Sequence, residues 1–237
     1  MLAGNRTEKD TIMLPRLSLA LLLLVTPALA LSHRAPPAPP DSPAAAPGAP
    51  VTIDAATVGG PRSNRPGELF MPPGTRPFPG MVVLHGCDGV GAHYRLLARR
   101  LAAWGYATIL VDSFRPRGVT NVCNAGLEVP PEAQASDAFA AAAYLRTLPQ
   151  VRADRIGVIG FSHGGWAVLK AVLSDVVANL HGTPFAPAVA FYPGCSAPAS
   201  ALVTDTLVLI GSDDDWTPAQ RCGAGGMPCR RRGTRCK

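Results

Sequence analysis

Short, continuous apolar runs alternate with stretches of helical periodicity along most of this chain. The runs are bounded by glycine, proline or polar residues, which is typical of buried parallel strands. They cover residues 67–72, 80–86, 106–114, 155–160, 187–194 and 206–212. The pattern therefore predicts a strand at each of these positions.

Apolar side chains recur at helical spacing between several of these runs. The first such stretch is 93–105, and its Gly105 stands where a helix C-cap belongs. The second is 130–148, with a proline in its first turn, and a single third helix is predicted at 163–180. Alternating units of this kind predict an α/β fold in which helices cover both faces of a mostly parallel sheet.

The N-terminal region has the pattern of an export signal. Arg16 precedes the apolar run Leu17–Val25, and Ala28–Ala30 offers small residues for cleavage, so residues 1–30 are expected to be a signal peptide. The run is shorter than the ~20 residues that span a bilayer, so no stable membrane span is expected. A Pro/Ala-rich linker follows at 31–50. We therefore expect a periplasmic or secreted protein.

Length and charge then limit the domain organisation and the partners. One α/β domain, at 51–220, fits a chain of 237 residues. The formal net charge of +6 comes from the tail 221–237, which has six basic residues and no acidic one. A nucleic-acid partner would need a basic face on the domain itself, with interleaved aromatic residues. None is visible, so no nucleic acid is expected to bind.

The motif Gly-x-Ser-x-Gly is formed by Gly160, Ser162 and Gly164, between a predicted strand and a predicted helix. A nucleophile elbow has this setting, because the serine hydroxyl must be presented at a sharp turn where larger residues would collide. The following helix N-terminus would also stabilise an oxyanion. The alternative is that Ser162 only caps a buried helix.

Four segments together resemble the dienelactone hydrolase family of α/β-hydrolases. They are the segments 82–118, 155–165, 190–195 and 209–218. The resemblance extends over about Gly67 to Cys222 and implies an α/β-hydrolase fold that cleaves esters or lactones through an acyl-enzyme. The family's type enzyme has a cysteine nucleophile, and this sequence has Ser162. The resemblance therefore favours a general carboxylester hydrolase, similar to secreted serine esterases.

The resemblance also implies roles for other residues. The backbone N–H groups of Cys87 and His163 would form an oxyanion hole. The pattern Gly-x-x-Asp-x-x-Thr-Pro selects Asp214 as the catalytic acid, with Asp213 and Asp215 as the alternatives. A solvated turn is the other interpretation of this acidic cluster.

The catalytic histidine of the family should follow a further C-terminal strand. All five histidines precede Asp214; they are His33, His85, His93, His163 and His181. The tail 221–237 has no strand pattern, so we expect a C-terminally truncated chain that lacks the last strand and the histidine loop, with an exposed sheet edge and poor solubility. A competing interpretation is a metal-binding tail. The tail contains no Cys-x-x-Cys pair and has no histidine nearby, so neither a metal site nor a cofactor is expected.

Two hypotheses on function remain open. The first is a serine hydrolase of small-molecule esters or lactones whose activity is impaired by the absent histidine. The second is a non-catalytic relative that only binds ligand. Arg115 and Arg117, which follow a predicted strand, could meet a substrate carboxylate or lie in a solvated loop.

Disulfide pairing follows from the predicted topology. Cys87 and Cys123 follow neighbouring strands at one edge of the sheet, as do Cys195 and Cys222, and an oxidising compartment preserves disulfides. Of the three pairings that four cysteines allow, we predict 87–123 and 195–222. Peptide mapping under non-reducing conditions should recover both linked pairs. Four free thiols would contradict the prediction.

Overall fold

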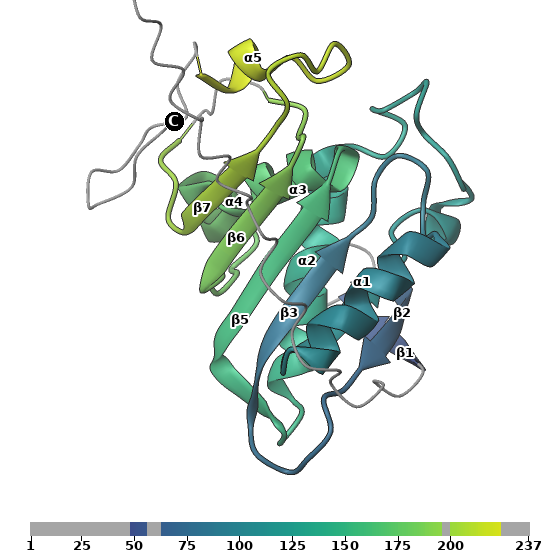
Figure 1. Ribbon diagram of the computed structural model, residues 1–237, viewed down its shortest axis with the longest axis vertical. Helices are drawn as coiled ribbons and strands as arrows, with labels where there is room; N and C mark the ends of the chain where they lie inside the picture. Colours follow the sequence, from purple (N-terminus) through teal and green to yellow (C-terminus); the bar gives the residue numbers. More distant parts are fainter. Residues whose placement is uncertain (1–47, 56–62, 196–199, 224–237) are drawn as a thin grey trace, which may run out of the picture. The chain divides into compact units, whose positions relative to one another are not determined.

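The computed structural model describes residues 48–55, 63–195 and 200–223 (Figure 1). The predicted signal peptide 1–30, most of the predicted linker and the tail residues 224–237 lie outside these ranges.

The described residues form one seven-stranded sheet in the order β1-β2-β4-β3-β5-β6-β7. The strands are β1 (Ala49–Asp54), β2 (Asn64–Phe70), β3 (Phe78–Leu84), β4 (Ala107–Val111), β5 (Val151–Phe161), β6 (Pro187–Phe191) and β7 (Asp205–Leu209). Pairing is antiparallel between β1 and β2 and between β2 and β4, and parallel from β4 to β7. The predicted mostly parallel sheet is confirmed.

Helices cover both faces of this sheet, as predicted. They are α1 (Ala92–Ala103), α2 (Pro131–Arg146), α3 (His163–Ala171), α4 (Ser174–Asn179) and α5 (Ala219–Gly223), with a short 3-10 turn η2 (Arg115–Arg117). Figure 1 shows α1 in front of the sheet and α2 and α3 behind it.

Strand β3 shows why the central strands are continuously apolar. Val82 and Leu84 pack in the layer formed with α2 and α3, whereas Met81 and Val83 pack in the layer formed with α1. Successive side chains of a strand point to opposite faces, and here both faces are covered. Every position from 80 to 84 is therefore buried.

The single helix predicted at 163–180 is wrong, because the structure has two helices there. Leu173 has extended backbone dihedrals and forms an isolated β-bridge with Leu202. The neighbouring Ser174 N–H donates to Ala201 O, and Val203 N–H donates to Val172 O. Pairing with the segment at 201–203 therefore replaces helical hydrogen bonds between α3 and α4.

The chain limits of the fold also differ from the prediction. Strand β1 begins at Ala49, inside the range predicted as linker. Its sequence is short and contains Pro50, which an edge strand tolerates. At the other end, α5 begins at Ala219, inside the predicted domain, and continues to Gly223, so its last residues and the disulfide partner Cys222 lie in the range predicted to be outside the fold.

A buried carboxylate joins three separate segments of the fold. Asp137 of α2 is 1 % exposed and binds Arg65 of β2 at 2.8 Å and Arg117 of η2 at 2.6 Å. Arg117 also donates to Ser113 O at 2.6 Å. Because the ions are buried, their loss would leave uncompensated charge in the interior.

Replacing this carboxylate with a neutral amide should destabilise the protein strongly. We expect Asp137→Asn to lower the free energy of unfolding by about 3 kcal/mol, because two poorly solvated guanidinium groups lose their counter-ion. Asp154→Asn is the control, since Asp154 is exposed beside Arg152 and should change stability by less than about 1 kcal/mol. Urea unfolding of both variants measures the difference, and equal midpoints would contradict the prediction.

Candidate active site

Ser162 lies at the turn between β5 and α3, at the carboxyl edge of the parallel strands. Its φ of 52° and ψ of −112° are unusual for a residue with a side chain. The turn is held on both sides, because Ser162 N–H donates to Phe191 O and Trp166 N–H donates to Ser162 O, each at 2.9 Å. The surrounding structure therefore keeps the serine in a strained conformation.

The glycines around Ser162 are required by close backbone approaches. A Cβ on Gly160 would lie 2.2 Å from Gly164 O, and a Cβ on Gly164 would lie 2.5 Å from the carbonyl oxygens of Leu84 and His85. A Cβ on Gly165 would lie 2.8 Å from another backbone oxygen. The motif thus brings the start of α3 directly against the end of β3.

The loop after β3 is organised by a tyrosine from α1. The hydroxyl of Tyr94 accepts from Gly86 N–H at 2.7 Å and donates to Asp88 Oδ1 at 3.1 Å. Burial raises the pKa of Tyr94 well above its ordinary value, so this hydroxyl stays protonated and can donate. The helical spacing of Tyr94 predicts only a buried core position, and nothing in that spacing indicates the hydroxyl contacts.

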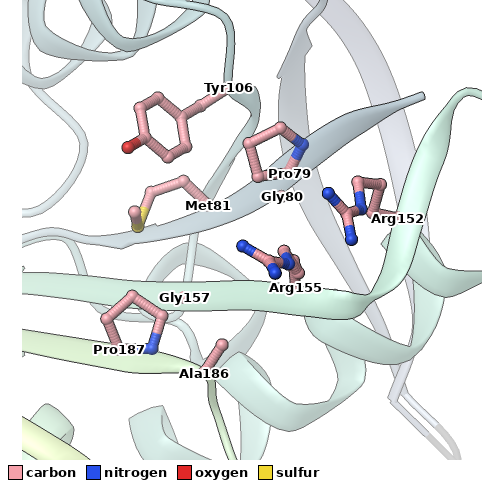
Figure 2. Close-up of a pocket in the computed structure, with 9 residues that line it drawn as sticks. All are labelled: Pro79, Gly80, Met81, Tyr106, Arg152, Arg155, Gly157, Ala186 and Pro187. Atoms are coloured by element: carbon pink, nitrogen blue, oxygen red, sulfur yellow. The ribbon is translucent and has the colours of Figure 1, made fainter. Parts of the chain in front are cut away.

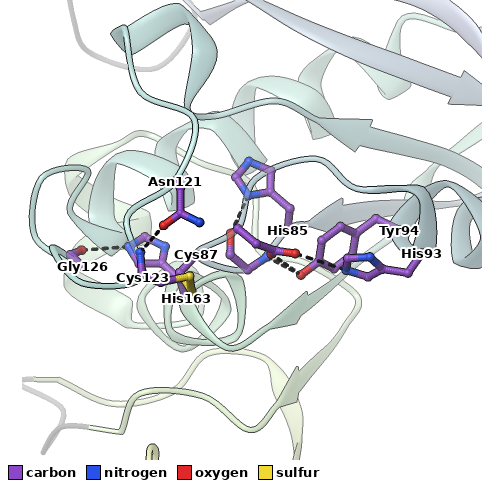
Figure 3. The surroundings of a disulfide bond; sticks show 10 residues. His85, Cys87, His93, Tyr94, Asn121, Cys123, Gly126 and His163 are labelled. Carbon is purple, nitrogen blue, oxygen red and sulfur yellow. Dashed lines mark hydrogen bonds and ion pairs between the residues drawn. A yellow bond between two sulfur atoms is a disulfide. The ribbon is translucent and has the colours of Figure 1, made fainter.

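The same loop is tied to the segment after β4 by a disulfide, shown in Figure 3. Cys87 is bonded to Cys123, and Val122 N–H donates to Cys87 O at 2.8 Å. Cys195 is likewise bonded to Cys222. The structure thus contains the two disulfides predicted from the strand order.

Two backbone N–H groups remain available at this edge of the sheet. His163 is the first residue of α3, where a backbone N–H has no intrahelical acceptor. Among the described residues, neither its N–H nor that of Cys87 donates to a protein acceptor. Both belong to segments that meet at Gly164.

Asp214 is the most enclosed of the three neighbouring aspartates after β7, since Asp213 and Asp215 are exposed. Its carboxylate accepts from the backbone N–H of Thr217 at 2.7 Å and from that residue's hydroxyl at 2.9 Å. These bonds hold the pKa of Asp214 below its ordinary value, so the group is ionised. The Thr217 hydroxyl also lies 3.3 Å from Tyr192 O, in the segment that follows β6.

None of the histidines in the described ranges hydrogen-bonds to Ser162 or Asp214. His85 is buried, and its hydrogen bonds are those of a neutral imidazole, because its Nδ1 donates to Gly86 O and its Nε2 accepts from Ser113 N–H. Burial lowers its pKa. His93 is exposed, 3.7 Å from Asp88. His33 lies outside the described residues.

The side chain of His163 is packed beside the turn of Ser162. Its two nitrogens contact Gln134 Oε1 and the carbonyl oxygens of Gly126 and Val129, all within 3.0 Å. Burial lowers the pKa of His163, and the two carbonyls act in the opposite direction. The sequence analysis did not single out Gln134, although an amide among the apolar residues of α2 indicates a buried polar group that needs partners.

Arg115 and Arg117, which the sequence suggests as partners of a substrate carboxylate, have acidic partners within the protein. Arg117 binds Asp137, and Arg115 lies 3.6 Å from Asp112. Each arginine therefore has a counter-ion in the structure.

A surface hollow of about 260 Å³ lies at the other end of the strands (Figure 2). Its lining includes Pro79, Arg152 and Pro187, from the amino-terminal parts of β3, β5 and β6. It is therefore separate from Ser162. The described ranges contain no cluster of possible metal ligands, and none of their helices is long and apolar enough to cross a membrane.

Comparison with known proteins gives a family and a fold. The family model described as "Dienelactone hydrolase family" matches residues 66–221. A Synechocystis protein, provisionally named a carboxymethylenebutenolidase, is 31% identical over 129 residues, which cover 48% of this chain and 51% of that protein. Mouse acyl-coenzyme A thioesterase 5 is 33% identical over 118 residues, which cover 47% and 26% of the two chains. The chain thus spans about half the length, or less, of these curated relatives.

Solved structures have the same fold. A provisionally assigned dienelactone hydrolase from Klebsiella pneumoniae superposes with a TM-score of 0.59 at 21% identity, over 74% of this chain and 77% of that one. A dienelactone hydrolase-like promiscuous phosphotriesterase from metagenomic libraries superposes with a TM-score of 0.57 at 21% identity, over 76% and 74%.

Adding one methyl group at the turn should be strongly destabilising. We expect Gly164→Ala to lower the free energy of unfolding by about 3 kcal/mol, because its Cβ would meet two backbone oxygens that cannot move independently of β3. Gly126→Ala is the matched control, since nothing lies within 4 Å of a Cβ there. Urea unfolding should separate the two variants clearly. A Gly164→Ala protein as stable as the control would refute the steric argument.

Proposed function

The chain belongs to the dienelactone hydrolase family, and from that membership we propose that it hydrolyses small carboxylic esters or lactones through an acyl-enzyme on Ser162. The strained backbone of Ser162 is the observation that carries the proposal. A serine that only capped a helix would have no need of a positive φ or of two glycines in contact with backbone oxygens. A nucleophile elbow needs both.

In the first half of this reaction the hydroxyl oxygen of Ser162 attacks the carbonyl carbon of the substrate, while a base removes the hydroxyl proton. The carbonyl oxygen becomes an oxyanion, which accepts from the N–H groups of Cys87 and His163. The positive end of the α3 dipole adds to this stabilisation. The bond to the alcohol oxygen then breaks, and the alcohol takes the proton from the base.

In the second half, water attacks the acyl-enzyme in the same way and releases the carboxylic acid. For a lactone, the acid and the alcohol remain in one molecule. The proposal requires no cofactor. We assign Asp214 as the carboxylate that orients and stabilises the protonated base, because it is ionised and follows β7 at the same edge of the sheet.

Among the described residues, no histidine hydrogen-bonds to Asp214, so they do not supply the base that this reaction needs. Loss of the histidine from a serine hydrolase lowers kcat on the order of 10⁶-fold, whereas the oxyanion hole and substrate binding retain ~10³–10⁴ over water. We therefore expect the 237-residue chain to hydrolyse activated esters slowly by itself. Imidazole added to the solution can replace the missing proton acceptor.

We also propose that the protein is exported. The apolar run Leu17–Val25 supports a signal peptide, and the two disulfides fit an oxidising compartment.

The decisive experiment combines labelling with chemical rescue. A fluorophosphonate should label Ser162, as identified by mass spectrometry, and imidazole should increase both the labelling rate and the hydrolysis of a p-nitrophenyl ester. Ser162→Ala should abolish labelling and leave only the imidazole-catalysed background. If the rate with imidazole is the same in the wild-type protein and in Ser162→Ala, the acyl-enzyme proposal is wrong.

A further inference from the structure

Gln134 is a polar side chain in the apolar layer between α2 and the sheet. It is fully buried near the start of α2, where its neighbours Ala135 and Ala138 are also buried. Burying an amide costs free energy unless its donor and acceptor groups find partners. The partners of Gln134 therefore explain why the helix has this residue here.

The two ends of the Gln134 amide contact the two segments that carry the candidate oxyanion donors. Its Nε2 donates to His85 O at 3.0 Å, two residues before Cys87. Its Oε1 lies 2.9 Å from Nδ1 of His163, whose backbone N–H is the second donor. Among the described side chains, Gln134 is the one that hydrogen-bonds to both segments.

The ring of His163 is fixed on its far side as well. Its Nε2 lies 3.0 Å from Gly126 O and 2.9 Å from Val129 O. The ring therefore stands between Gln134 and the segment that follows the Cys87–Cys123 disulfide. A displaced ring would displace the first residue of α3 with it.

We propose, on the basis of the acyl-enzyme function above, that Gln134 is a positioning residue that fixes the separation of the Cys87 and His163 N–H groups. Donors stabilise an oxyanion only when they lie within hydrogen-bonding distance of the place where it forms. A displacement of about 1 Å can reduce the rate about a hundredfold. The amide acts through the two backbone segments and does not touch the substrate.

The protons of this contact give it a distinct signature. The three polar partners of the His163 ring nitrogens are all oxygens that accept hydrogen bonds. Both nitrogens can donate to them only when the ring carries a proton on Nδ1 and on Nε2. Burial lowers the pKa of His163, while the Gly126 and Val129 carbonyls and the Glu132 carboxylate of α2 raise it. A protonated His85 on the side of β3 would repel it. A carboxylate at position 134 should therefore raise the pKa of His163.

The main test is the rate at which a fluorophosphonate modifies Ser162 in the presence of imidazole. Gln134→Met keeps the length of the side chain and removes both hydrogen bonds. It should lower the maximal rate about tenfold to a hundredfold and leave the reagent concentration at half-saturation unchanged. Gln150→Met makes the same substitution at an exposed turn and should react like the wild type. A folded Gln134→Met protein that reacts within twofold of the wild type would overturn the proposal.

Two further measurements do not depend on the reaction of Ser162. The backbone amide NMR chemical shifts of Cys87 and His163 should change in Gln134→Met relative to the wild type, and unchanged shifts would overturn the proposal even if Ser162 is unreactive in every variant. Failure of the acyl-enzyme is thereby distinguished from failure of the positioning role. If Gln134→Met does not fold, Gln134→Glu keeps the contact with His163, and nitrogen NMR should show a raised His163 pKa. An unchanged pKa would contradict the contact.

Discussion

The close approach of the start of α3 to the end of β3 is the constraint on which the rest of the structure depends. The backbone of Gly164 lies against the carbonyl oxygens of Leu84 and His85 with no room for a methyl group. This contact requires the sharp turn at Ser162, and the turn is held in place because Phe191 O accepts its N–H. The positions of β3, β5 and β6 are thus coupled through one residue with strained backbone dihedrals.

Helix α2 connects this turn to the remainder of the domain through polar side chains on three of its positions. Glu132 binds Lys170 of α3 at 2.8 Å. Gln134 contacts the backbone at the end of β3 and the ring of His163. Asp137 binds two arginines from other segments. A helix rich in alanine can pack closely, and these three polar groups add directional contacts to that packing.

The sequence predicted the parallel strands, the turn at Ser162 and both disulfide pairs, because each depends on local pattern or on strand order. It failed where distant backbone decides the outcome. The break between α3 and α4 depends on pairing with Leu202, which no helical periodicity reveals. The partners of Arg117 and Gln134 are likewise set by tertiary packing. A residue type shows that a polar group needs a partner, and only the fold shows which one.

In a protein that is exported as proposed above, the Cys87–Cys123 disulfide also affects the order in which the site is assembled. Its two cysteines are separated by 36 positions, and the ring between them contains α1 and β4 but not Ser162. In a chain that crosses a membrane N-terminus first, this ring can close while β5 is still inside the translocation channel. Pairing of parallel strands is slow because a long connection must be ordered first, and a closed ring holds β3 and β4 ready for it. Ser162 is then added to a loop that is already cross-linked.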